Sequence, residues 1–110
     1  MQIVNLTPHT LNILNADGSV RVDVAPSGLV ARVATSRVQT GEVNGIPLFT
    51  TTFGEVTGLP EAHPHIILVV SGLVAGHPSV RVREDVWSPG ELVRDERGQP
   101  IGCRGLTRTA

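Results

Sequence analysis

The chain has 110 residues, a length that fits one domain with a single hydrophobic core and is too short for two. Its formal net charge is −1, so it has no overall positive field to attract duplex nucleic acid or an anionic membrane. No apolar run approaches the ~20 residues of a membrane span, and no signal peptide is evident, so we expect a cytoplasmic protein. Cys103 is the lone cysteine, which excludes an internal disulfide framework.

All nine basic residues are arginines, and the chain has no lysine. A genome that prefers arginine codons explains this composition, and so does selection for the bidentate anion contacts that guanidinium groups make. In either case, Schiff-base chemistry on a lysine is excluded.

Short segments of strand-forming residues alternate with turn residues along the whole chain. In chain order, the expected strands cover residues 2–6, 11–14, 20–24, 29–33, 38–43, 46–53, 66–70, 91–94 and 101–106. The segment 20–24 is amphipathic, with Val20, Val22 and Val24 on one face. The apolar run 66–70 suits a strand buried on both faces, and residues 73–75 after it suit one helical turn.

Turn residues predict three hairpins. Residues 15–18 join the strands at 11–14 and 20–24, and residues 95–98 join the last two strands. Asn44-Gly45 is the dipeptide best suited to a type I′ turn between residues 38–43 and 46–53. Residues 88–90, Ser-Pro-Gly, predict a further turn. Between Phe49 and Phe53, three consecutive threonines present hydroxyls to both faces of a strand, either toward a ligand or as a plain β-surface.

These patterns predict a mainly β fold, a small barrel-like or sandwich domain of hairpins with at most one short helix. An α+β fold is the alternative. The whole of 1–110 is expected to form one domain, with residues 107–110 as a frayed tail.

The histidines raise a metal hypothesis, because His63 and His65 would lie on one side of an extended segment with His9 or His77 nearby. The spacing fits no zinc pattern, so no metal site is predicted. His77-Pro78-Ser79 has the H-x-[ST] form of the two-histidine phosphoesterases, but a second copy is missing, so no catalytic residues are assigned.

Cys103 shares a strand face with Ile101, which favours a small buried side chain over a nucleophile. The glycines form neither a P-loop nor a dinucleotide fingerprint, and no cofactor is expected.

A polar binding surface is the remaining hypothesis. Arginine, hydroxyl and amide groups hold phosphate oxygens, and an aromatic or imidazole ring can stack on a base. Each of these residues also has a plain structural explanation as a turn, surface or core residue. The candidate ligand contacts are Thr7, His9, Thr10, Arg81, Arg83, Trp87, Ser88 and Arg94.

The opening Asn5-Leu6-Thr7-Pro8-His9 resembles the start of a group of small bacterial and phage proteins without a settled activity. The end of the chain, S-P-G-E-L-V-R-D-E-R-G followed by I-G-C-R, is similar to the end of the same group. The resemblance implies a bacterial or phage context and transfers no catalytic residue.

Together these features predict a non-enzymatic, homo-oligomeric protein that binds a phosphorylated small molecule. By analogy of size and setting, the ligand would be a nucleotide immune signal, such as a cyclic nucleotide or an ADP-ribose derivative, sequestered by a phage. Two alternatives stay open. One is a His-dependent phosphodiesterase acting on such a nucleotide, and the other is an interaction module that inhibits or scaffolds a host protein.

Overall fold

A computed structural model describes residues 2–17 and 19–108. This part of the chain is mainly β with one short helix, as predicted. Its elements are β1 (Gln2–Asn5), β2 (Leu11–Leu14), β3 (Val20–Val24), β4 (Arg32–Val43), β5 (Ile46–Thr57), β6 (Ile66–Val69), α1 (Gly72–Ala75), β7 (Val86–Arg94) and β8 (Pro100–Thr107).

Six strands form one mixed sheet in the order β1-β6-β7-β8-β2-β3. β1 and β3 are its edges, so the described strands do not close into a barrel. Three neighbouring pairs are parallel, namely β1 with β6, β6 with β7, and β2 with β8. Two predicted hairpins, β2–β3 and β7–β8, lie side by side in this sheet and are joined by the parallel pair of β2 and β8. β6 and β1 extend the sheet through the other two parallel pairs.

The connection from β6 to β7 supplies the crossover that parallel neighbours need. Ser71 caps α1, and its Oγ accepts a hydrogen bond of 3.4 Å from the amide of Val74. Val74 and Ala75 are buried on the sheet. The predicted helical turn is therefore confirmed, and it begins at Gly72. No helix in the described ranges has the length and apolarity to cross a membrane.

The core is built around this crossover. Its buried side chains are Leu6, Ala31, Leu68, Val70, Val74, Ala75, Val80 and Val86. β2 and β8 bury a further group, which includes Ile13 and Cys103. The prediction that Cys103 is buried is confirmed, because it is 2% exposed. The apolar face predicted for β3 does not join the core in the same way, since Val20 and Val22 on that face are exposed.

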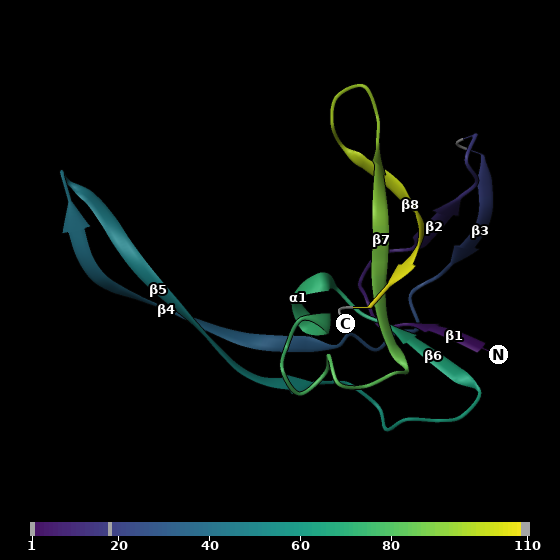
Figure 1. Ribbon diagram of the computed structural model, residues 1–110, viewed down its shortest axis with the longest axis horizontal. Coiled ribbons are helices and arrows are strands. Elements are labelled where there is room, and N and C mark those ends of the chain that lie inside the picture. Colours follow the sequence, from purple (N-terminus) through teal and green to yellow (C-terminus); the bar gives the residue numbers. More distant parts are fainter. Residues whose placement is uncertain (1, 18, 109–110) are drawn as a thin grey trace.

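β4 and β5 form a separate two-stranded hairpin, which we call the arm (residues 32–57). Asn44 and Gly45 have φ angles of 53° and 80°, which confirms the type I′ turn. Figure 1 shows the arm extending away from the six-stranded sheet. The radius of gyration is accordingly 16.5 Å, compared with about 13 Å for a compact chain of this length.

Two predictions near the end of the chain differ from the structure. The turn predicted at residues 88–90 is wrong, because β7 runs through it. Glu91 in β7 has a positive φ of 50°, and the register with β8 shifts between Val93 and Arg94. In the segment expected to fray, Thr107 pairs with Ser88, and the Arg108 guanidinium lies 5.7 Å from the centre of the Trp87 ring. Residues 109–110 lie outside the described part of the chain.

Candidate functional site

The N-terminal bend is organised by Asn5, whose side chain is buried. Its Oδ1 accepts hydrogen bonds from the amide and the hydroxyl of Thr7, at 2.9 and 2.7 Å. Its Nδ2 donates to the carbonyls of His9 and Val24, at 2.7 and 3.0 Å. Thr7, a predicted ligand contact, is itself buried and bound within this network. The side chains of His9 and Thr10 lie on the exposed outside of the bend.

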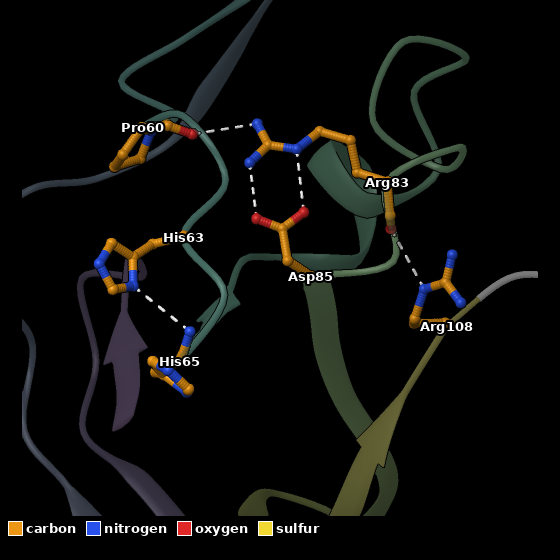
Figure 2. A network of polar contacts seen from close by, with 6 residues as sticks. All are labelled: Pro60, His63, His65, Arg83, Asp85 and Arg108. Atoms are coloured by element: carbon orange, nitrogen blue, oxygen red, sulfur yellow. Dashed lines mark hydrogen bonds and ion pairs between the residues drawn. The ribbon is translucent and has the colours of Figure 1, made fainter. Parts of the chain in front are cut away.

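Arg83 forms a polar clasp between the loop before β6 and the start of β7 (Figure 2). Its Nε and Nη2 donate to both carboxylate oxygens of Asp85, at 3.0 and 2.7 Å, and its Nη1 donates to the carbonyl of Pro60 at 3.0 Å. The Arg83 carbonyl accepts a hydrogen bond from Nε of Arg108. The guanidinium is therefore bound by the protein on several sides, and its charge is balanced by a carboxylate.

An open hollow of about 640 Å³ lies beside the clasp. It is lined by Ala62, His63, Pro64, Ile66, Ile67, Arg83, Glu84, Asp85 and Trp87. Arg83 and Trp87 are the two predicted ligand contacts that the structure brings together here. Glu84 and Asp85 contribute two carboxylates against one guanidinium, so the local charge does not favour a phosphorylated ligand.

The other predicted contacts do not join them. Thr7 lines a different hollow, between the β1–β2 bend and α1. Arg94 donates to the carbonyl of Gly98 in the β7–β8 turn. Arg81 is exposed in the loop after α1, and Ser88 is buried in β7. The predicted residues are therefore distributed over several places in the described structure.

The histidines serve local contacts. Nδ1 of His63 accepts a hydrogen bond from the amide of His65 at 3.3 Å, as Figure 2 shows. His77 contacts Ser79 Oγ through Nδ1 at 2.8 Å and the carbonyl of Gly54 in β5 through Nε2 at 2.9 Å. A neutral ring protonated on Nε2 satisfies both contacts, so His77 joins the loop after α1 to the base of the arm.

The arm gathers many of the exposed large hydrophobic side chains of the described residues. Val33 and Val56 at its base pack against the core. Beyond them the side chains are exposed on both sides of the hairpin. One side, the aliphatic face, carries Val38, Val43, Ile46 and Leu48, which are 45–63% exposed.

The opposite side, the aromatic face, carries Phe49 and Phe53, which are 45% and 55% exposed. Arg37 lies across the hairpin from Thr51, and its guanidinium carbon stands 4.3 Å from the centre of the Phe49 ring. A hairpin with exposed apolar groups on both faces has the character of a protein-binding surface.

The edges of the arm differ from one another. In the described structure, no strand pairs with the outer edge of either β4 or β5. The register shifts at Thr40 in β4, and this strand carries Arg32, Arg37 and Glu42. Residues 46–54 of β5 carry no charge at all. Charges, prolines and bulges are the devices that protect an edge from pairing. On β5 they stand at the two ends, as Pro47 and as a second register shift beside Gly54 and Glu55, so only residues 48–53 of β5 are open.

Sequence reasoning missed the most organised residues of this structure. Asn5 belongs to the N-L-T-P-H motif. A short hydrogen-bonding side chain shortly before a proline bend is the pattern that could have identified its role. The arm was signalled by two strand predictions on either side of Asn44-Gly45. The exposure of the arm could not be predicted from the sequence, because the same apolar residues would also suit a buried hairpin.

Comparison of the chain with protein-family models, with curated proteins and with solved structures gives no match.

Proposed function

We propose that this chain is a non-enzymatic assembly protein whose copies associate through the arm. The observation that carries the proposal is the exposed apolar arm itself, residues 32–57, with uncovered side chains on both faces and an uncharged, regular stretch of open β5 edge at residues 48–53. The proposal takes up the homo-oligomer expected from the sequence, and it differs from the interaction-module alternative, whose partner is a host protein.

A two-stranded hairpin is marginally stable in water unless it packs on something else. Only the base of the arm packs on the core, through Val33 and Val56. The exposed stretch beyond it includes Val38, Val43, Ile46, Leu48, Phe49 and Phe53. Covering half of a phenylalanine side chain removes about 100 Å² from water, which corresponds to about 2.5 kcal/mol. Association therefore stabilises the arm as well as the assembly.

The charge of the arm supports a second copy as the partner. Arg32 and Arg37 are balanced by Glu42 and Glu55, so the arm is neutral. Two neutral arms do not repel each other, and a surface selected for a charged partner would carry an excess of one sign. Two-fold dimers are also the commonest assemblies of soluble proteins.

Sequestration of a phosphorylated ligand stays a prediction from the sequence. Its proposed contacts lie in separate places, and Arg83 is engaged by Asp85. The phosphodiesterase alternative also stays a prediction, and the hydrogen bonds of His77 to Ser79 and Gly54 give that ring a structural role.

Sedimentation velocity on the full chain tests the proposal. At about 100 μM, far above a typical dissociation constant of about 1 μM, the wild type is expected to sediment at a multiple of its 11.7 kDa mass. The double variant Phe49→Ser/Phe53→Ser is expected at 11.7 kDa, because it removes the aromatic face.

The matched control is Val20→Ser/Val22→Ser, which changes two similarly exposed residues on β3, outside the arm. It should sediment like the wild type. A wild-type chain that is monomeric at this concentration, or a loss of association in the β3 variant but not in the arm variant, would contradict the proposal.

A further inference from the structure

The middle of β5 reads the same in both directions. Phe49-Thr50-Thr51-Thr52-Phe53 is a palindrome centred on Thr51, and it lies in the uncharged stretch of the open edge. The pairing of β5 with β4 is regular from Thr35↔Phe53 to Gln39↔Phe49, so the five residues alternate strictly between the two faces.

Resting on the proposed self-association, we infer that β5 pairs antiparallel with β5 of a second copy across a two-fold axis at Thr51. The two arms then form one four-stranded sheet in the order β4-β5-β5-β4. An isologous interface requires a self-complementary surface, and a palindrome on an antiparallel strand provides one.

The register follows from the sequence. Phe49 of one copy lies opposite Phe53 of the other, Thr50 lies opposite Thr52, and Thr51 meets its own counterpart. Aromatic and threonine cross-strand pairs are among the favourable ones in antiparallel sheets. Residues opposed across the axis, such as Phe49 and Phe53, are an even number of positions apart in the sequence. Along a strand, the amide and carbonyl of every second residue point to the same edge. The outward-pointing amides of one copy therefore meet the outward-pointing carbonyls of the other.

The edge of β4 does not offer an equivalent pairing. Its regular ladder is broken at Thr40, and Arg37 and Glu42 lie on either side of that break. On β5, Pro47 has no amide to donate and limits the pairing on the tip side. The second register shift, just after Phe53, limits it on the base side. The palindrome lies wholly within the remaining stretch.

The same register has a consequence for the tip of the arm. Because the strands run antiparallel, Val43 and Ile46 of each copy are carried alongside the base of the other copy's arm. The aliphatic residues at the tip therefore approach the part of the partner that is anchored to its core through Val33 and Val56.

Cysteine cross-linking tests the register. In the Thr51→Cys variant, the two introduced cysteines face each other with Cα atoms about 4.5–5.5 Å apart, which a disulfide can span. A mild oxidant is expected to convert most of this variant to a covalent dimer on a non-reducing gel. Cys103 is 2% exposed and can be kept, with the wild type as the control for its reactivity.

Val38→Cys is the matched control, since Val38 is exposed on β4 across the hairpin from Thr50. In the four-stranded sheet, two β4 strands are separated by three strand spacings, about 14 Å, which exceeds the reach of a disulfide. Val38→Cys should therefore stay uncoupled. Efficient coupling of Val38→Cys with none at Thr51→Cys would overturn the register.

A charge swap gives an independent readout. Thr51→Lys and Thr51→Glu each place like charges on the two-fold axis, so each variant alone should associate at least about tenfold more weakly than the wild type. Mixing the two should restore a dimer that contains one copy of each. Unchanged association of both single variants would overturn the placement of the axis.

These results separate the inference from the proposed function. A wild type that associates while Thr51→Cys fails to couple would leave assembly through the arm standing and reject β5 pairing. A wild type that is monomeric, with no coupling at either cysteine, would reject both.

Discussion

The side chain of Asn5 uses all the hydrogen-bonding positions that an amide offers. It donates to the carbonyls of His9 and Val24 and accepts from the amide and hydroxyl of Thr7. These contacts close the bend after β1 and fix the end of β3 to it. The conspicuous opening motif of the chain is thus accounted for by its structure.

Replacing Asn5 with alanine is expected to lower the free energy of unfolding by about 2–4 kcal/mol, because several buried partners lose their hydrogen bonds. Urea denaturation followed by circular dichroism measures this loss. Asn12→Ala is the control, since its side chain makes one exposed contact of 3.4 Å, to the carbonyl of Ile101. Similar losses in the two variants would refute the role assigned to Asn5.

Arg81 and Arg83 have the same chemistry and very different surroundings. The side chains of Arg83 and Asp85 are 23% and 16% exposed and form a bidentate pair, whereas Arg81 is exposed. Arg83→Ala should lower the free energy of unfolding by about 1–3 kcal/mol, and Arg81→Ala should change it by less than about 0.5 kcal/mol.

Thermal denaturation of both arginine variants, with and without a panel of nucleotides, also tests the ligand prediction. Nucleotide-dependent stabilisation of the wild type that is lost in Arg81→Ala would favour a ligand site and weaken the assembly account. We expect no nucleotide-dependent shift, because the candidate contacts are dispersed.

Among the elements, the arm depends on how its base is held. His77 bonds to the carbonyl of Gly54 in β5, close to the point where Val56 enters the core. His77→Ala should loosen this attachment and increase protease cleavage within the arm severalfold, with only a small loss of global stability, about 1 kcal/mol.

His65→Ala is the control for this experiment, because His65 is exposed in the loop before β6. Limited proteolysis with mass spectrometry locates the cuts. Cleavage that rises equally in both variants, or that rises outside residues 32–57, would show that His77 does not anchor the arm.

The elements were predictable where local chemistry decides them. Alternating valines, the Asn44-Gly45 turn and the apolar run before Ser71 each act over a few residues, and β2, β3 and α1 appear close to their expected positions. Parallel pairing is a property of distant segments. The registers Gln2↔Ile66 and Ile13↔Cys103 join residues far apart in the chain, and no local pattern specifies them.

The candidate site was less predictable for a related reason. Arginine and hydroxyl residues indicate anion binding only when they converge, and the structure satisfies Arg83 with Asp85, two positions along the chain. The Phe-Thr-Thr-Thr-Phe segment was noted for its hydroxyls. That this segment lies on an open sheet edge follows only from the structure, in which β5 has no neighbouring strand on its outer side.

At the scale of the whole molecule, the shape is a body with one projecting arm (Figure 1). The body contains the buried core, and the arm has the exposed aliphatic and aromatic faces. Such a division suits a subunit that keeps its own fold and joins others through an extension. Assembly is therefore the central claim about this protein.

Amide hydrogen exchange on the full chain, read residue by residue by NMR, tests that claim most directly. In an isolated hairpin, the amides of a strand alternate between bonding to the other strand and facing water. We predict slow exchange at every residue from Phe49 to Phe53, and an alternating pattern at the paired residues 35–39 of β4. Alternating exchange in both strands, at a concentration of about 100 μM, would contradict the account.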